Sequence, residues 1–177
     1  MAPKTFRTPA LLGVALLLNA CGLIKTPSAP LPDVTVNVPP LTSPSETVVY
    51  EGSNVFQSFT LPGILSHVSV TGQATYAGLA GTRTFNLMLT TQRPDCPEVS
   101  GSLVCTNSRG GGEVIGTVTL SPGQSAAVNL SGSALDQAAH SGVGYLGLQF
   151  QNGPRSGPGD TLKLSNLRAT LRASAAL

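Results

Sequence analysis

Residues 113–130 have the sequence EVIGTVTLSPGQSAAVNL, in which two alternating runs flank a short turn motif. In the first run Val114, Val118 and Leu120 share one parity and predict a buried face, while threonines occupy the other parity. Ser121-Pro122-Gly123-Gln124 places Pro and Gly at the central positions of a type II turn. The stretch therefore predicts two half-buried strands joined as a β-hairpin.

The same period of two recurs along the chain after residue 46. The predicted strands are 47–51, 55–61, 65–76, 82–91, 113–120, 124–130, 143–151 and 160–172. About eight short strands separated by Gly and Pro turns predict an all-β domain over residues 46–177, an antiparallel β-sandwich or jelly roll. One short helix is predicted at residues 134–140, with Ser133 as its N-cap.

The composition disfavours several other classes of protein. Among 177 residues there are 20 Gly and 14 Pro, and only 10% are charged, which is unlike a helical bundle or coiled coil. The net charge of +2 argues against nucleic acid as a partner. An apolar content of 41% is too high for a wholly disordered chain.

The first 20 residues have the three zones of a secretory signal peptide. Lys4 and Arg7 form a positive start, Ala10–Leu18 is apolar, and small residues follow. The apolar run has nine residues, whereas a helix needs about 20 to cross a bilayer. We therefore expect residues 1–20 to direct export and to be removed.

The end of this segment, Leu18-Asn19-Ala20-Cys21, resembles the lipobox of bacterial lipoproteins, although Asn19 is unusual at its position. The resemblance implies cleavage before Cys21 and acylation of its thiol and new amine, with palmitate as a typical chain. It also implies a lipid-anchored protein of the exported cell envelope. Gly22 follows where Asp often signals inner-membrane retention in that family, which favours the outer membrane. The alternative is an ordinary signal peptide with a chance Cys.

Residues 21–45 are predicted to be a lipidated Cys followed by a Pro/Ser/Thr-rich linker. Six prolines lie within residues 22–45, which predicts neither helix nor sheet. Fully extended, this linker would span about 70 Å and lift the domain off the membrane. A disordered N-terminus without that role is the alternative. Removal of Lys4 and Arg7 leaves eight cationic side chains against eight carboxylates, so the mature chain is formally neutral.

The two remaining cysteines, Cys96 and Cys105, predict a disulfide bond. They are an even pair in an exported chain and flank a loop between two predicted strands. Closing a loop of about ten residues stabilises a fold by roughly 2–3 kcal/mol in the chain-entropy model. Two free thiols, or half of a metal site, are the alternatives.

Residue patterns that would support catalysis are weak. His67 is predicted on a polar strand face, and Asp136 and His140 have helical i, i+4 spacing without a third partner. The stretch from Arg109 to Gly112 lacks the Gly-Lys-Ser/Thr ending of a phosphate-binding loop. Residues 152–160 offer calcium one carboxylate, Asp160. We therefore predict no enzyme activity, no cofactor and no metal.

Two hypotheses for function follow. The first is a non-catalytic interaction or structural module of the cell envelope, with the membrane as partner through its acyl chains and with envelope proteins or anionic envelope polymers as further candidates. The second is a glycan- or small-ligand-binding jelly roll, since residues 160–171 are faintly similar to the last strand of such modules. Trp is absent, so sugar stacking would depend on Tyr50, Tyr76 or Tyr145.

The last predicted strand carries a cluster of cations. Leu162 and Leu164 differ in parity from Leu167, Ala169 and Leu171, which predicts a β-bulge near Ser165-Asn166. With that bulge, three cations point outward: Lys163, Arg168 and Arg172. Only Asp160 is close in sequence to neutralise them. They predict a contact strip for an anionic surface, or otherwise an ordinary protected strand edge.

Overall fold

The structure, a computed structural model, describes residues 28–57, 65–79, 81–106, 110–152 and 155–173. Within them the elements are β1 (Ala29–Pro30), β2 (Val34–Val38), the 3₁₀ helix η1 (Pro44–Glu46), β3 (Thr47–Glu51), β4 (Leu65–Ala77), β5 (Arg83–Thr90), β6 (Glu98–Val99), β7 (Ser102–Thr106), β8 (Glu113–Leu120), β9 (Ser125–Ser131), α1 (Ser133–Ser141), β10 (Tyr145–Phe150) and β11 (Asp160–Ala173). All strand pairs are antiparallel.

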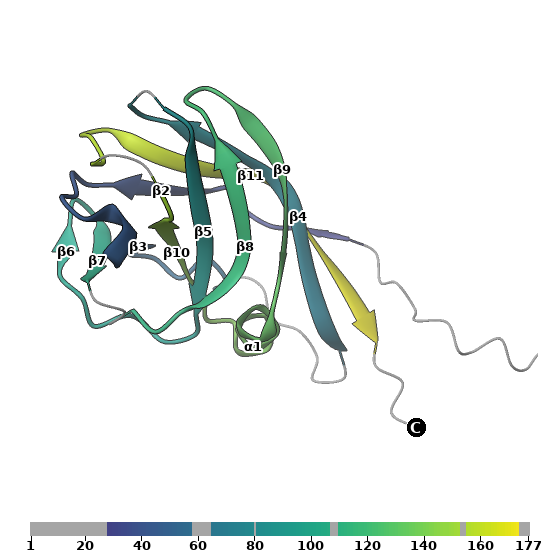
Figure 1. Cartoon of the computed structure of the whole chain (residues 1–177). Helices are drawn as coiled ribbons and strands as arrows, with labels where there is room; N and C mark the ends of the chain where they lie inside the picture. Colours follow the sequence, from purple (N-terminus) through teal and green to yellow (C-terminus); the bar gives the residue numbers. More distant parts are fainter. Residues whose placement is uncertain (1–27, 58–64, 80, 107–109, 153–154, 174–177) are drawn as a thin grey trace, which may run out of the picture.

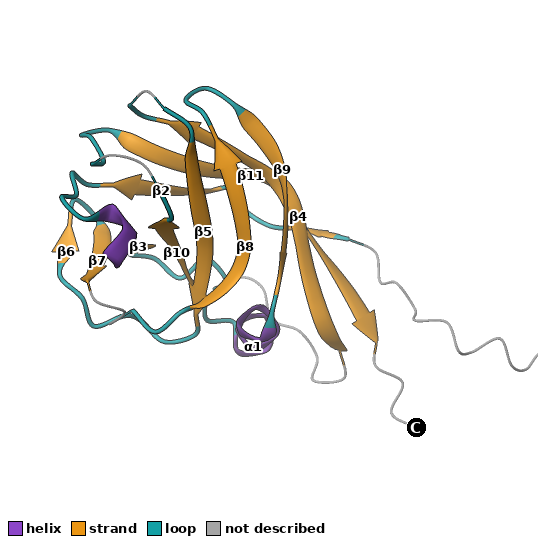
Figure 2. Cartoon of the chain, viewed as in Figure 1, coloured by secondary structure: helices purple, strands orange, loops and turns teal. Residues whose placement is uncertain are grey.

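The strands form two sheets that pack face to face (Figure 1). The five-stranded sheet has the order β1-β11-β4-β9, with β2 also paired to β11, and the six-stranded sheet has the order β6-β7-β3-β10-β5-β8. Helix α1 lies at one end of the sandwich, below β8 and β9 in the view of Figure 2. The predicted all-β antiparallel sandwich is therefore confirmed.

The core between the sheets is built from the predicted alternation. On β5, Phe85, Leu87 and Leu89 are buried while the intervening side chains are half-buried on the outer face. Burial of each such side chain contributes about 1.5–3 kcal/mol. The Phe85 ring lies 5.1 Å from those of both Tyr76 and Phe150, so aromatic contacts join the two sheets at this level.

Within residues 113–130 the predicted turn forms, but the two strands that it connects do not pair with each other. Gly123 has φ +78°, and the Gln124 amide donates to the Ser121 carbonyl at 3.0 Å, as a type II turn requires. However, β8 pairs with β5 and β9 pairs with β4, so the turn joins the two sheets instead of closing a hairpin. A register shift opposite Leu87 and Met88 also turns Val114 outward, where it is 46% exposed, and buries Ile115 in its place.

The predicted bulge in the last strand is confirmed. The register of β11 against β4 shifts between Ser165 and Arg168, and Asn166 has φ +54°. The apolar residues before and after the shift are all buried: Leu162, Leu164, Leu167, Ala169 and Leu171. One extra residue therefore reconciles the two parities on a single face.

The prediction of a linker over residues 21–45 is wrong for the second half of that range. β2 pairs with β11, with Val36 opposite Leu162, and the side chains of Val34, Val36 and Val38 belong to the core. The sequence VTVNV alternates like any strand, and the prolines that flank it at positions 32 and 39 end the strand without interrupting it. The domain therefore begins near Ala29, not at residue 46.

Two further segments differ from prediction. Residues 55–57 form a turn, with Asn54 Oδ1 accepting the amides of Phe56 (3.0 Å) and Gly144 (2.9 Å), and the rest of the predicted strand 55–61 lies outside the described residues. The structure also adds a strand that the alternation did not suggest, β7, which carries Cys105.

Helix α1 exists as predicted, but Ser133 is not its N-cap. Gly132 occupies the cap position, and the Glu113 carboxylate of β8 accepts the amides of Ser133 (3.0 Å) and Ala134 (2.8 Å). It also accepts the Ser133 hydroxyl. These contacts, led by that of the hydroxyl, lower the pKa of Glu113. The cap therefore comes from a neighbouring strand, because Gly132 has no side chain to supply it.

Candidate binding surfaces

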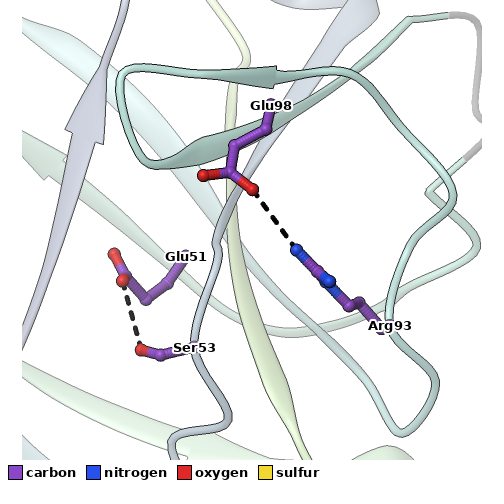
Figure 3. A network of polar contacts seen from close by, with 4 residues as sticks. All are labelled: Glu51, Ser53, Arg93 and Glu98. Atoms are coloured by element: carbon purple, nitrogen blue, oxygen red, sulfur yellow. Dashed lines mark hydrogen bonds and ion pairs between the residues drawn. The ribbon is translucent and has the colours of Figure 1, made fainter.

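A disulfide-closed loop covers one part of the outer face of the six-stranded sheet. Cys96 and Cys105 are joined, as predicted. Cys105 packs with Val48, Tyr50 and Leu103 in a small second core on that face. The loop is further closed by an exposed ion pair, in which Arg93 Nη2 lies 3.4 Å from Glu98 Oε2 (Figure 3).

Tyr50 lies at the centre of this second core and is fully buried. A Cβ added at Gly110, Gly112 or Gly147 would collide with the Tyr50 ring or hydroxyl, so glycine is required at all three positions. Burial outweighs the opposing effect of the Gly112 backbone and raises the pKa of Tyr50 to about 12. Gly110 and Gly112 thus make room for an aromatic ring, and Tyr50 offers no platform to a ligand.

A buried polar cluster occupies the region predicted as a possible calcium site. The Asp160 carboxylate accepts the Tyr76 hydroxyl (3.1 Å) and the amides of Leu79 (3.0 Å) and Gly157 (3.2 Å). The fully buried Arg83 guanidinium lies 6.0 Å from the Tyr76 ring centre and 5.4 Å from that of Phe150. Because donors surround Asp160, its oxygens are not available to a cation, and Tyr76 is no sugar platform either.

The remaining part of the same outer face is a continuous array of neutral polar side chains. They come from β5, β8, β10 and the residues that follow β10, and none is charged. We call them the amide–hydroxyl face: Thr84, Asn86, Thr117, Thr119, Gln149, Gln151 and Asn152. All are exposed or half-buried. Single polar positions were visible in the sequence, but their convergence depends on the strand order β10-β5-β8.

These side chains hold one another in place. The Thr117 hydroxyl donates to Asn86 Oδ1 (3.0 Å), and Thr84 and Thr119 share a hydroxyl–hydroxyl bond (3.0 Å). Gln149 Nε2 donates to the Ser45 carbonyl at 3.0 Å. Each amide and hydroxyl can make further bonds, so the array is both ordered and able to bind. Tyr145, half-buried, borders the face on β10.

The three predicted cations of β11 do not form a uniform strip. Lys163 is 52% exposed but pairs with Asp33, 3.1 Å away, a partner that lies far from it in sequence. Asp160, predicted to neutralise the strip, is buried elsewhere. Arg168 is exposed beside β1, and Arg172 is placed on β11 by its backbone, opposite Ser66. Among the described residues, Arg168 has no ion-pair partner.

The predicted helical pair, Asp136 and His140, is engaged by backbone groups. Asp136 Oδ1 accepts the Val68 amide at 2.6 Å, and His140 Nδ1 bonds to the Asp136 carbonyl at 2.7 Å instead of its carboxylate. His67 is exposed with φ +57°. Over the described ranges no three His, Cys, Asp or Glu side chains lie close enough to hold a metal ion.

A polar groove of about 400 Å³ lies between β2 and the end of β3. Its lining includes Asp33, Glu51, Ser53 and Asn54. Glu51 Oε1 accepts the Ser53 hydroxyl at 3.2 Å (Figure 3), while Asp33 and Asn54 are engaged by the contacts given above. The side chains of Asp33, Glu51, Ser53 and Asn54 therefore already have partners within the protein.

The N-terminal predictions cannot be placed in the fold, because Cys21 and residues 1–27 lie outside the described residues. No helix in the described part of the chain is both long and apolar enough to span a membrane.

No protein-family model matches this chain, and neither does any curated protein. Among solved structures, it is similar to part of a structure that contains the CBM22-1 and GH10 modules of the N-terminal endo-1,4-β-D-xylanase 10B of Clostridium thermocellum, complexed with xylohexaose. The similarity has 16% identity and a TM-score of 0.35, and covers 71% of this chain but 19% of that chain. A likeness of this extent assigns no ligand.

Proposed function

We propose that the chain is a lipid-anchored protein of the bacterial envelope whose β-sandwich is a non-catalytic binding module. Its binding surface is the amide–hydroxyl face, and its ligand class is an uncharged polysaccharide. The observation that carries this proposal is the combination of an ordered hydrogen-bonding array with the absence of charge on its seven side chains.

Neutral sugars are the ligands that match such a face. Their hydroxyl groups both donate and accept, as do the Thr, Asn and Gln side chains. The side chains are already held by mutual hydrogen bonds, so binding would order few of them further. Tyr145 borders the array and is half-buried, whereas Tyr50 and Tyr76 are fully buried. An anionic polymer would instead need cations, which this face lacks.

The ligand proposal is tested with the full chain in native gels containing neutral soluble polysaccharides, including β-1,4- and α-1,4-linked glucans. We expect retardation that is insensitive to salt between about 0.05 and 0.5 M, because no charge is involved. The double variant Asn86→Ala and Gln149→Ala should lower the affinity about five- to tenfold. The matched control is Asn129→Ala, exposed on β9 of the other sheet. Equal retardation of the double variant and the unmodified chain, or none by any glycan, would overturn the proposal.

The anchoring proposal rests on the Leu18-Asn19-Ala20-Cys21 motif and is tested separately. Mass spectrometry of protein from the membrane fraction should give a chain that begins at Cys21 and carries acyl groups. Cys21→Ser should leave an uncleaved precursor or release the protein. An unchanged mass and unchanged fractionation of that variant would contradict lipidation.

A further inference from the structure

The outer face of the six-stranded sheet is not polar throughout. Along β8 and β5, the amide–hydroxyl face is followed by Val114 and Met88, which lie opposite each other. On β10 it is followed by Tyr145, which pairs with Thr90, two residues beyond Met88 on β5. Val114 is 46% exposed, and Met88 and Tyr145 are half-buried. We call these three side chains the apolar border.

The exposure of Val114 is a consequence of the irregularity in β8. The register of β8 against β5 shifts at Leu87 and Met88, so Ile115 is an extra residue in β8. Without it, the side chain at position 114 would face the core, as that of Val118 does. Such bulges are frequent next to binding sites, where they re-aim a side chain. Here the bulge places an aliphatic side chain directly beside the polar array.

Hydrogen bonds alone give a sugar little advantage over water at such a face. Each ligand hydroxyl replaces water molecules that bond to the same side chains, so the net gain is small. Apolar contact favours binding in proportion to the area buried, and water cannot replace it. Pyranose rings have both kinds of surface, with hydroxyl groups at their edges and C–H groups on their faces. A polar row beside an apolar row is therefore the arrangement that distinguishes a sugar from water.

The spacing of the two rows fits one extended sugar chain. Neighbouring strands lie about 4.8 Å apart, so the apolar border extends about 10 Å across β8, β5 and β10. The nearest row of the amide–hydroxyl face consists of Thr117, Asn86 and Gln149 and crosses the same three strands. Along β5, Asn86 is two residues, or about 7 Å, from Met88. A chain lying across the strands can thus place ring faces on the border and hydroxyl groups on the polar row.

We infer that the ligand is a neutral β-1,4-linked glycan, with consecutive ring faces on the apolar border and hydroxyl groups on the adjacent polar row. The inference rests on the proposed function, because it concerns the same face. In a β-1,4-linked chain of glucose the bonds between rings are equatorial, so the chain is extended and its ring faces are uncovered. An α-1,4-linked chain coils, because its bond at C1 is axial, and lays fewer rings on a sheet. Val114, the most exposed member of the border, is the residue that determines this specificity.

The test compares two isomers of the same composition, cellotetraose (β-1,4) and maltotetraose (α-1,4), with the full chain. In saturation-transfer NMR with cellotetraose, we expect the C–H protons of the ring faces to receive at least about twofold more saturation than the methylene protons at C6, because the faces lie on the border. In titration calorimetry, cellotetraose should bind at least about fivefold more tightly than maltotetraose.

Substitutions at Val114 test its role directly. Val114→Thr keeps the shape of an exposed side chain but replaces a methyl group with a hydroxyl, and should lower the affinity for cellotetraose about three- to fivefold. Val114→Tyr should raise that affinity at least about threefold by adding stacking surface, a gain that a merely structural role would not produce. The matched control is Val99→Thr, the same change at a 42% exposed valine of β6, which should leave the affinity unchanged.

The outcomes separate this inference from the proposed function. If both tetraoses bind equally and Val114→Thr has no effect, while Asn86→Ala with Gln149→Ala lowers the affinity, the face binds glycans without using the apolar border. The inference is then overturned and the proposed function stands. Tighter binding of maltotetraose than of cellotetraose also overturns the inference alone. If neither these tetraoses nor any neutral polysaccharide binds, the proposed function and the inference are both overturned.

Discussion

Asp33 forms an ion pair with Lys163 at 3.1 Å, and its second carboxylate oxygen accepts the Asn166 amide at 3.2 Å. One side chain from the β1–β2 connection thus engages both the outward face of β11 and the amide exposed by its bulge. Both ion-pair partners are about half exposed, so the pair contributes only about 0.2–1 kcal/mol. Most of the stabilisation of this segment must therefore come from the valines of β2.

Replacing the central valine of β2 tests that conclusion. Val36 is fully buried, so Val36→Ala should lower the free energy of unfolding by about 2 kcal/mol, as measured by urea denaturation. Thr35→Ala on the exposed side of the same strand should change it by less than about 0.5 kcal/mol. Equal, small effects of both variants would mean that β2 is not part of the core.

The disulfide should stabilise the fold without being essential for the main core. Cys96 and Cys105 are nine residues apart, and opening so short a loop should cost about 2–3 kcal/mol. We expect the Cys96→Ala and Cys105→Ala double variant to keep the far-ultraviolet circular dichroism of the parent but to unfold at lower urea. Intact protein should not react with a thiol reagent before reduction. Ready alkylation without reductant would contradict the bond.

Because the Glu113 carboxylate caps α1, the free energy of unfolding should decrease at acid pH. The hydroxyl and amide donors of Ser133 and Ala134 lower the pKa of Glu113 below its ordinary value of 4.5. Its stabilising effect is therefore complete above pH 4.5 and is lost as the pH falls through the lowered pKa. Glu113→Gln should cost about 1 kcal/mol at pH 7 and almost nothing at about pH 2.

The control for this experiment is Glu46→Gln, since Glu46 is exposed in η1. Urea denaturation of parent and variants at several pH values measures the difference directly. If Glu113→Gln lowers the free energy of unfolding by the same amount at neutral and acid pH, the charge of Glu113 is unimportant for the cap.

The buried guanidinium is expected to be structural. Arg83 is fully buried between the Tyr76 and Phe150 rings and donates to the Arg155 carbonyl at 3.3 Å. Arg83→Met would remove the cation from the neighbourhood of buried Asp160 and should destabilise the fold by about 3 kcal/mol. Arg83→Lys should be intermediate, because it keeps the charge but loses the planar stacking. Thermal unfolding measures both, with Arg93→Met as the exposed control, and a fully stable Arg83→Met would refute this role.

Some features were predictable because their cause is local. The type II turn at residues 121–124 follows from Pro and Gly at its centre, and the β11 bulge follows from a change of parity that only an extra residue can repair. The bond between Cys96 and Cys105 was predictable because only one pair remained. In each case the residues concerned are close in the chain.

Other predictions were wrong because the residues that decide the structure there are distant in the chain. Val34–Val38 alternates like a strand, yet six nearby prolines suggested a linker, and only the open edge of β11 decides that the segment is a strand. Ser133 is a good N-cap by type, but Glu113 is brought to the helix by β8. Lys163 was expected to belong to an outward strip of cations with Asp160 as the nearest carboxylate in sequence, but Asp33 pairs with it across 130 residues of sequence.

The sequence by itself determined that the chain is an antiparallel sandwich, because period-two burial and Gly/Pro turns are properties of neighbouring residues. The tertiary structure decided which strands share a sheet, that β8 and β9 belong to different sheets, and that the neutral side chains of β5, β8 and β10 meet on one face. It also decided that Tyr50 is covered and that Asp160 is surrounded by donors. The physical reason is that strand pairing is set by the burial of both faces at once, which no single segment encodes.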